Sequence, residues 1–442
     1  MPHMKEKISS FQIIIFGFLA VILAGTLLLM LPISSAAGVW THFADAMFTS
    51  VSAVCVTGLV IFDTATRWSA FGQAVILLLI QIGGLGVVSV TAMIAIVSGR
   101  KISLLQRSLL QESISANQIG GLVRMTGFIF KFAFTAELLG AVLMLPAFMK
   151  DHGVSGIWMA VFHSVSAFCN AGFDVMGRTS GAFSSLTHYS AHLGVVIPVC
   201  LLIVTGGIGF LTWDDCAAHR LQLKRYLMQS KVILTTTLLL IVLPAVLFFV
   251  RDFADHPLKE RLCLSLFQAV TPRTAGFNTT GLNVMSAGSR MVMIFLMLIG
   301  GSPGSTAGGM KTTTVAVLFA NAVAVVNKKK NACLFGRRIE DATVKNAATL
   351  LVMYLFLFLA GALIISASDN LPLFSCLFET ASAIGTVGLS LGITPQLGML
   401  SKAVLMILMF FGRVGGLTLL FAALNSKGVE VSLRPVEKIN VG

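Results

Sequence analysis

Four short segments of this chain resemble one another, and this repetition constrains the fold more than any other feature. They are FTSVSAVCVTGL at 48–59, FHSVSAFCNAGF at 162–173, FQAVTPRTAGF at 267–277 and FETASAIGTVGL at 378–389. Each begins with Phe and reaches a glycine that is followed by Leu or Phe. The third copy is shorter between Phe and Gly, so either it has lost one residue or Leu266 takes the place of its Phe. We therefore expect a chain built from four copies of one unit.

Apolar stretches of two kinds flank each copy. A long apolar stretch precedes it, at approximately 9–33, 126–148, 232–250 and 346–367. A glycine pair inside an apolar run follows it, at Gly83–Gly84, Gly206–Gly207, Gly300–Gly301 and Gly415–Gly416. The unit is thus an outer helix, a short segment and an inner helix. We expect repeats at 1–110, 111–225, 226–335 and 336–442, with a broken inner helix in the third and a C-terminal tail in the fourth.

Composition indicates that these helices lie in a membrane. Of 442 residues, 56% are hydrophobic and 11% charged, whereas soluble proteins carry about 25% charged residues. Residues 11–33 hold no charge, and about 20 apolar residues suffice to span a bilayer. Because no small-residue cleavage site follows this first stretch, we expect a retained helix and not a signal peptide.

The net charge of +13 is distributed as in a membrane protein. With the amino terminus inside, 19 of the 31 Lys and Arg residues fall on the inner side, mainly at 98–125, 214–231 and 327–345. This asymmetry predicts cytoplasmic N- and C-termini and a basic face against the anionic lipid of the bilayer. Because the basic residues alternate with apolar spans and form no single groove, we expect no nucleic acid as a partner.

The four repeated segments, of about 10–12 residues, are too short to cross a bilayer as helices. Each is typical of a half-length helix followed by a turn that contains Gly. Irregular backbone at membrane depth is tolerated where it lines a water-filled cavity; the alternative is a set of buried turns in a helical bundle. We therefore expect an all-α membrane protein in which four repeats of outer helix, pore loop and inner helix place eight transmembrane helices around one central pore.

The residues at the end of each repeated segment suit a selectivity filter for a cation. Backbone carbonyl rings replace the hydration shell of potassium, and glycine adopts unusual backbone angles without blocking the lumen. No acidic ring accompanies the glycines, and the half-helices would point their negative carboxyl ends at the ion. The candidate filter residues are Val56, Thr57, Gly58, Asn170, Ala171, Gly172, Thr274, Ala275, Gly276, Thr386, Val387 and Gly388. These features favour a cation over an anion but do not separate potassium from sodium.

A candidate gate lies in the run 291–326, which as a straight helix of about 54 Å would exceed the hydrocarbon core of about 30 Å. Its middle is rich in Gly and contains Pro303, which breaks a helix, so we expect a loop that lines the cavity below the filter. Arg413 needs acceptors that this loop can supply; the alternative is that Arg413 snorkels or only joins helices. The candidate gate residues are Gly300, Gly301, Ser302, Pro303, Gly304, Ser305, Thr306, Ala307, Gly308, Gly309, Lys311 and Arg413.

Other reactive side chains do not assemble into an active centre. The eight histidines and seven cysteines show no metal-ligand spacing, so we expect no metal site, no cofactor and no enzymatic activity in this chain. His163 is expected to be a packed or interfacial side chain. Glu137 and Glu379 are costly in lipid and need partners, and we favour structural anchors over proton-linked sites.

The segments VTGL, NAGF, RTAGFNT, GTVGLS and SPGSTAGGMKTTT resemble the filter and intramembrane-loop sequences of the Trk/Ktr/HKT superfamily of potassium transporters. The resemblance covers essentially the whole chain and is greatest to the membrane subunit of the bacterial Ktr system. It implies potassium uptake across the bacterial cytoplasmic (inner) membrane, with K+ as substrate and Na+ as a further ion on which uptake depends. In plant relatives a Ser at the first filter glycine accompanies sodium preference, so Gly58 favours potassium.

The same resemblance implies partners. It implies a homodimer seated on a separate cytosolic nucleotide-binding ring of the Ktr/RCK type, which would bind ATP or ADP. The expected contacts are 98–125, 214–231, 327–345 and the tail after Asn425. The alternative function is a secondary transporter with broken helices for another solute, but that would require inverted repeats, whereas the four copies share one orientation. A membrane enzyme would require a cluster of His, Asp and Glu around one aqueous chamber.

Overall fold

Four long helices, one in each repeat, expose much of their apolar surface. The computed structural model describes residues 9–99, 103–114, 121–220, 222–416 and 418. The long helices are α1 (Ser10–Met30), α7 (Leu122–His152), α12 (Met228–Arg251) and α16 (Asp341–Asp369). Each is long and apolar enough to cross a membrane, and only 28% to 33% of its most apolar stretch is buried inside the protein. The rest is exposed hydrophobic area that a soluble monomer rarely presents, so these helices contact lipid.

The first outer helix begins where the sequence offers a capping box. Ser9 accepts the N–H of Gln12 at 3.2 Å, and the side chain of Gln12 accepts the N–H of Ser9 at 3.0 Å. These two bonds satisfy backbone donors that a helix start leaves without partners. The helix ends at Met30, just before Pro32, whose ring cannot continue it. Local sequence therefore sets both ends of this span.

A short helix follows each outer helix and packs against it. These pore helices are α2 (Phe43–Val54), α8 (Ser155–Phe168), α13 (Leu258–Val270) and α17 (Leu373–Gly385). With 12 to 14 residues, each reaches about 20 Å at 1.5 Å per residue, which is less than the hydrocarbon thickness of about 30 Å. They are therefore half-length helices that end inside the protein.

The inner helices are interrupted more often than the sequence predicted. They begin as α4 (Ala70–Leu85), α10 (Leu193–Ile208), α14 (Ala287–Leu298) and α18 (Met399–Val414), and the first three resume as α5 (Val87–Val97), α11 (Phe210–His219) and α15 (Thr312–Val326). A break was expected in the third repeat alone, but the first and second also bend, by 95° each. The bends lie at Gly86 and Gly209, whose φ angles of 86° and 97° are favourable only for glycine. A glycine that turns a chain looks, in the sequence, like any other glycine in an apolar run.

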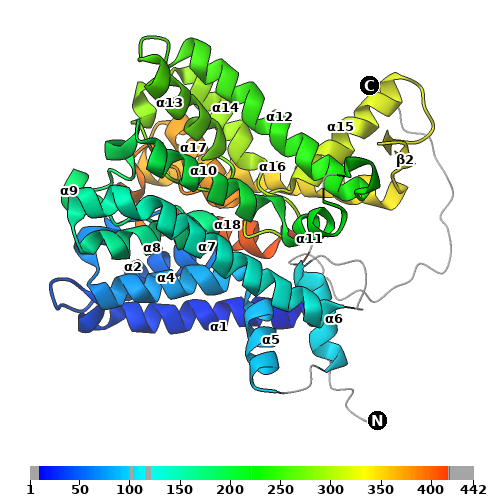
Figure 1. Ribbon diagram of the computed structural model, residues 1–442. Coiled ribbons are helices and arrows are strands. Elements are labelled where there is room, and N and C mark those ends of the chain that lie inside the picture. Colours follow the sequence, from blue (N-terminus) through cyan, green and yellow to red (C-terminus); the bar gives the residue numbers. More distant parts are fainter. Residues whose placement is uncertain (1–8, 100–102, 115–120, 221, 417, 419–442) are drawn as a thin grey trace.

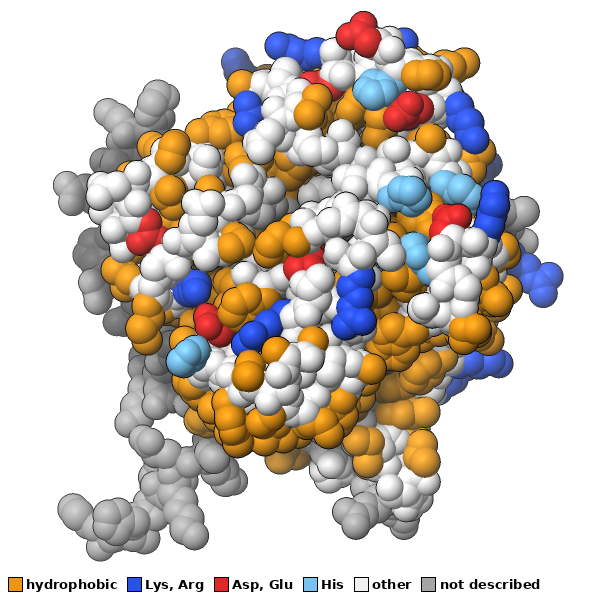
Figure 2. All heavy atoms as spheres, turned by 90° about the vertical axis from the view of Figure 1, so that its left-hand side faces the viewer, with side chains coloured by type: hydrophobic (Ala, Val, Ile, Leu, Met, Phe, Trp, Pro, Cys, Tyr) orange, Lys and Arg blue, Asp and Glu red, His pale blue; other side chains and the backbone are white. Residues whose placement is uncertain are grey.

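Short elements connect these helices. Three are helices, α3 (Thr64–Arg67), α6 (Leu104–Ile114) and α9 (Gly177–Ser180). Short 3-10 turns lie at Pro32–Ser34, Thr187–Tyr189, Leu223–Arg225, Leu282–Val284 and Thr394–Gln396. Strands β1 (Cys333–Leu334) and β2 (Arg337–Arg338) form an antiparallel hairpin in which Cys333 pairs with Arg338. In Figure 1 the long helices run from side to side across the view, while α5 and α6 project from the lower edge. The end on the left of that view, shown face-on in Figure 2, carries scattered charged and His side chains, as a face in contact with water would.

The architecture is that of an all-α, multi-pass membrane protein. The described residues contain four helices that cross a membrane by length and composition, or six when each bent pair counts as one span. The broken pair α14–α15 and the 16-residue α18 are the inner helices of the third and fourth repeats. Each repeat thus contributes an outer helix, a pore helix and an inner helix, in that order.

Candidate functional site

After each pore helix the backbone adopts positive φ angles at two positions, with one residue of ordinary φ between them. Four residues with side chains have positive φ angles between 51° and 67°, namely Val56, Asn170, Thr274 and Thr386. Two positions later comes a glycine with φ between 69° and 93°, namely Gly58, Gly172, Gly276 and Gly388. The left-handed region costs roughly 1–2 kcal/mol for a residue with a side chain, and it is unusual for the β-branched Val56. The same strained backbone therefore recurs in all four repeats, at the candidate filter residues.

The four glycines form a closed ring in which each lies against the next repeat. A Cβ atom added at Gly58 would collide with the carbonyl oxygen of Ala171, one at Gly172 with that of Ala275, one at Gly276 with that of Val387, and one at Gly388 with that of Thr57. The contacts run through repeats one, two, three and four and return to one. No side chain fits at these glycines, because the neighbouring carbonyl oxygen already occupies the space. The ring brings one carbonyl oxygen from each repeat to the same level.

A cavity of about 410 Å³ opens on one side of this ring and is lined by all four glycines. Asp63 and Asp174 lie on its wall; the sequence shows no acidic ring beside the glycines, and these two carboxyls come from the first and second repeats alone. Asp63 caps α3 by accepting the N–H of Thr66 at 3.0 Å, and Asp174 accepts the N–H of Met176 at 3.0 Å. Burial raises the pKa of Asp174 to about 6, and the charge of Asp63 acts in the same direction. This cavity, called the vestibule below, therefore carries negative charge beside the ring.

The structure also resolves the register of the third repeat. Phe267 is fully buried, as are Phe48, Phe162 and Phe378 in the other repeats, whereas Leu266 is 39% exposed. Phe267 is thus the equivalent residue, and α13 ends earlier than its counterparts, at Val270. The missing residue was lost from the turn between pore helix and glycine, because the buried helix face is needed for packing.

Residues 299–311, between α14 and α15, are not helical and fold back on themselves. The N–H of Gly300 donates to the carbonyl of Met310 at 2.8 Å, and the N–H of Gly301 donates to that of Gly308 at 3.2 Å. This segment, which holds all the candidate gate residues except Arg413, is called the loop below. A Cβ at Gly308 would collide with the side chain of Thr386, so the loop contacts the filter residues of the fourth repeat.

Backbone hydrogen bonds tie the loop to the inner helices of two other repeats. In the second repeat, the N–H of Thr306 donates to the carbonyl of Gly206 at 3.2 Å and the N–H of Ser302 to that of Gly207 at 3.0 Å. In the fourth repeat, the carbonyl of Gly412 accepts the N–H of Gly309 at 3.0 Å. The loop therefore connects the inner helices of the second, third and fourth repeats.

Arg413 joins the loop to the first repeat. Its guanidinium donates to the carbonyl of Thr306 in the loop and to the carbonyls of Gly83 and Gly84, the last at 2.9 Å. The loop was the expected acceptor, and the two glycines of α4 are acceptors that the sequence did not indicate. Lys311 bonds within the loop itself, to the carbonyls of Ala307 at 2.9 Å and Gly308 at 3.5 Å. Arg413, from the fourth repeat, thus links the third repeat to the first, whereas Lys311 adds hydrogen bonds within the loop.

The glycine pairs permit close contact with the pore helices. A Cβ at Gly83, Gly206 or Gly412 would collide with the carbonyl oxygen of Val54, Phe168 or Ile384, respectively, at the ends of three pore helices. In the fourth repeat the glycine pair of the sequence is Gly415–Gly416, but the glycine that contacts the pore helix is Gly412. Gly415, with φ of 95°, instead corresponds to Gly86 and Gly209, the glycines at the bends of the first two inner helices. Arg413 therefore stands where the first two repeats have their second glycine, which explains how its side chain reaches between repeats.

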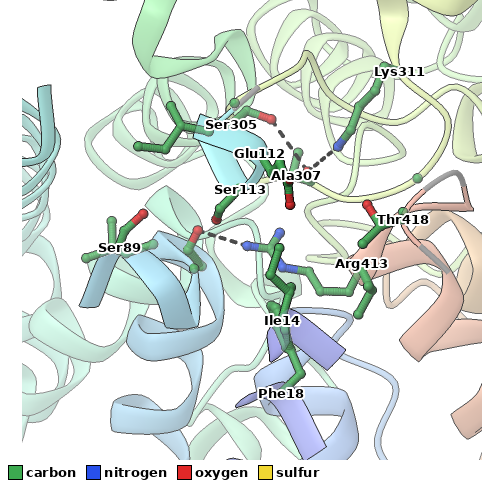
Figure 3. A pocket seen from close by; sticks show the side chains of 18 of the residues that line it. Ile14, Phe18, Ser89, Glu112, Ser113, Ser305, Ala307, Lys311, Arg413 and Thr418 are labelled. Atoms are coloured by element: carbon green, nitrogen blue, oxygen red, sulfur yellow. Dashed lines mark hydrogen bonds between the residues drawn. The ribbon is translucent and has the colours of Figure 1, made fainter. Parts of the chain in front are cut away.

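A second cavity, of about 260 Å³, lies beside the loop. Loop residues and Arg413 line it, together with Glu112 of α6. In Figure 3 the side chains of Arg413 and Lys311 extend toward this cavity from α18 and from the start of α15. Glu112, which the sequence did not single out, places an acidic group on the same wall, and partial burial raises its pKa.

The isolated polar side chains in the helices have local partners. Gln81 donates to both carboxylate oxygens of Glu137, at 2.9 and 3.2 Å, and Thr394 donates to Glu379. His163 is fully buried and stacks on Phe148 with ring centroids 5.3 Å apart. Within the described part of the chain, no group of three or more His, Cys, Asp or Glu residues is placed to hold a metal ion. Glu137 and Glu379 thus each have a side-chain hydrogen-bond partner, as a structural anchor requires.

Comparison with known proteins agrees with this architecture. The chain matches the TrkH family, described as "Cation transport protein", over residues 5–428. It is 38% identical to the potassium/sodium uptake protein NtpJ of Enterococcus hirae, over 100% of this chain and 99% of the relative. It is 36% identical to the Ktr system potassium uptake protein B of Bacillus subtilis, over 93% and 92% of the two chains.

A solved structure shares the fold. The crystal structure of the potassium transporter TrkH from Vibrio parahaemolyticus aligns with 96% of this chain and 86% of its own, with a TM-score of 0.75 and 19% sequence identity. The family is one of transporters and not of enzymes. The four-repeat helical architecture, the family match over nearly the whole chain and the full-length relatives lead to one conclusion. The chain belongs to the TrkH family of cation transport proteins.

Proposed function

We propose that this protein takes up potassium across the cytoplasmic membrane of a bacterium through one pore formed by its four repeats. The observation that carries this proposal is the closed ring in which each filter glycine lies against a carbonyl oxygen of the next repeat. A ring of backbone carbonyls replaces the hydration shell of potassium. The names of NtpJ, a potassium/sodium uptake protein, and of the Ktr system potassium uptake protein B both include potassium, which supports the same substrate.

The twelve candidate filter residues, from Val56 to Gly388, line the ion path in this proposal. The pore helices end beside the ring and direct their negative dipole ends toward it. Asp63 and Asp174 add negative charge to the vestibule, which attracts cations before they reach the ring. Both effects favour cations over anions. The preference for potassium over sodium rests on the spacing of the carbonyls, which the left-handed backbone holds.

The loop and Arg413 act as the gate. The loop spans the inner helices of the second, third and fourth repeats through backbone hydrogen bonds, and Arg413 links it to the first. An ion that leaves the ring toward the second cavity meets this segment. Because hydrogen bonds make up these links between the loop and the inner helices, the loop can move without unfolding the helices around it.

A cytosolic nucleotide-binding ring that binds ATP or ADP controls this gate. The chain acts as a homodimer. Its potassium uptake depends on sodium. The name of the Bacillus subtilis relative, protein B of a Ktr system, supports a system with more than one component. The N- and C-termini lie on the cytoplasmic side, together with the basic segments 98–125, 214–231 and 327–345, and these three segments contact the partner. The tail after Asn425, a further contact in this proposal, lies outside the described residues.

Growth and flux experiments test the proposal. Expression of the chain with its partner subunit should restore growth of a potassium-uptake-deficient bacterium at limiting potassium. Purified protein in liposomes should carry potassium in preference to sodium, and added sodium and nucleotide should change the rate when the partner is present. A chain that reaches the membrane folded but carries no potassium under any of these conditions refutes the proposal.

A further inference from the structure

A hydroxyl residue stands four positions after the repeated Phe in every repeat, within the pore helix in three of them and directly after α13 in the third repeat. These residues are Ser52, Ser166, Thr271 and Ser382. All four are completely buried. The position holds a hydroxyl even in the third repeat, where the turn that follows is one residue shorter. A buried hydroxyl needs a hydrogen-bond partner, and the partners of these four are the informative feature.

Each of the four hydroxyls bonds to the backbone of its own filter segment. Ser52 accepts the N–H of Gly58 at 3.1 Å, and Ser382 accepts the N–H of Gly388 at 3.0 Å. In the two middle repeats the hydroxyl donates instead, to the carbonyl of the Phe that follows the glycine. Ser166 bonds to Phe173 at 2.7 Å and Thr271 to Phe277 at 2.6 Å. The contact therefore always falls on the filter glycine or on the residue after it.

The main chain of the same residues holds the other side of each glycine. The carbonyls of Ser52, Ser166 and Ser382 accept the N–H of the residue just before the glycine, at 2.7 to 2.8 Å. The carbonyl of Thr271 does the same for Ala275 at 3.0 Å. One residue in or directly after each pore helix thus holds its filter glycine from both sides, once through the backbone and once through the hydroxyl.

These contacts act where the backbone is strained. The glycine and the residue two positions before it both have positive φ, as at Val56 and Gly58 with 56° and 86°. Such conformations persist only where the surrounding structure holds them. The geometry points to the four hydroxyls as positioning residues that set the carbonyl ring and thereby the discrimination between potassium and sodium. This inference rests on the proposed function, because it assigns selectivity to the same ring.

Neighbouring hydroxyls in the same pore helices bond elsewhere and provide matched controls. Ser50 and Ser164, two positions earlier, are also buried. Ser50 donates to the carbonyl of Ile22 at 2.7 Å, and Ser164 donates to that of Glu137 at 2.5 Å. Both acceptors belong to outer helices. Removing either hydroxyl costs one buried hydrogen bond to a backbone group but leaves the filter backbone untouched.

The test compares Ser52→Ala, Ser166→Ala, Thr271→Val and Ser382→Ala with Ser50→Ala and Ser164→Ala in liposomes that contain the purified protein. The readouts are the ratio of potassium to sodium uptake and the apparent KM for potassium. We expect the ratio to fall by roughly tenfold in the first set, because a backbone group of the filter loses its partner. We expect wild-type ratios in the two control variants, and also in Thr271→Ser and Ser166→Thr, which keep the hydroxyl.

Two results would overturn the inference while leaving the proposed function intact. One is an unchanged ratio in all four filter-side variants of a wild-type protein that does discriminate. The other is an equal loss in Ser50→Ala and Ser164→Ala, which would indicate general destabilisation. If the alanine variants do not reach the membrane, Ser52→Cys and Ser382→Cys keep the size while weakening the hydrogen bond, and an unchanged ratio there also overturns it. Wild-type protein that carries no potassium refutes the proposed function itself.

Discussion

Replacement of Arg413 by Ala is expected to raise potassium flux by releasing the loop. The guanidinium donates to one carbonyl of the loop, at Thr306, and to two carbonyls of the first repeat, at Gly83 and Gly84. The Thr306 bond alone connects Arg413 to the moving segment. A hydrogen bond to a charged group contributes about 1.5–3 kcal/mol, and each 1.4 kcal/mol is a factor of ten in an equilibrium. The open population should therefore increase by roughly 10- to 100-fold from its low starting value.

The measurement is potassium flux into liposomes that contain the purified protein, with and without the partner subunit. Arg413→Lys should give an intermediate flux, because Lys retains the charge but not the planar fork of donors. Arg261→Ala is the control, since Arg261 bonds to the carbonyl of Phe249 at 2.7 Å, away from the loop. Deletion of 305–308 should raise flux as well. Unaltered or lower flux in both the Arg413→Ala and deletion variants, with normal amounts of folded protein, would refute the gate.

Gly58→Ser should weaken discrimination against sodium, because its Cβ would collide with the carbonyl of Ala171, while Gly38→Ser, at a similar φ of 68° but in open space, should not; equal sodium uptake by both variants would argue against the ring. Burial raises the pKa of Asp174 to about 6, so this carboxyl is ionised above that pH and neutral below it. Uptake at low potassium should therefore decline as the external pH falls through about 6, and an unchanged pH profile in Asp174→Asn would contradict this. Glu137→Gln should retain transport. Glu137→Leu should lower the free energy of unfolding by roughly 1–3 kcal/mol, and with it the melting temperature, because the bonds to Gln81 are lost. Loss of pH-dependent transport in Glu137→Gln would indicate a proton-linked site instead.

The sequence determined the class of protein and its fourfold organisation. Long apolar runs, a charge-free first helix and the excess of Lys and Arg on one side are properties of local composition, so they predict membrane spans without any tertiary information. The repeated Phe-to-Gly segments likewise predicted half-length helices with glycine turns. The Gly- and Pro-rich stretch of the third inner helix predicted its interruption, because Pro and Gly act on the backbone where they stand.

Other features depended on contacts between residues far apart in the chain, and only the tertiary structure decided them. The bends at Gly86 and Gly209, the register of Phe267 and the partners of Arg413 on α4 follow from packing between repeats. The closed order of the ring is of the same kind, since Gly388 meets the carbonyl of Thr57, more than three hundred residues away. A hydrophobic pattern records which face of a helix is buried, but it does not record which carbonyl of a distant repeat approaches that face. That choice is made by the geometry of four half-length helices meeting around one space.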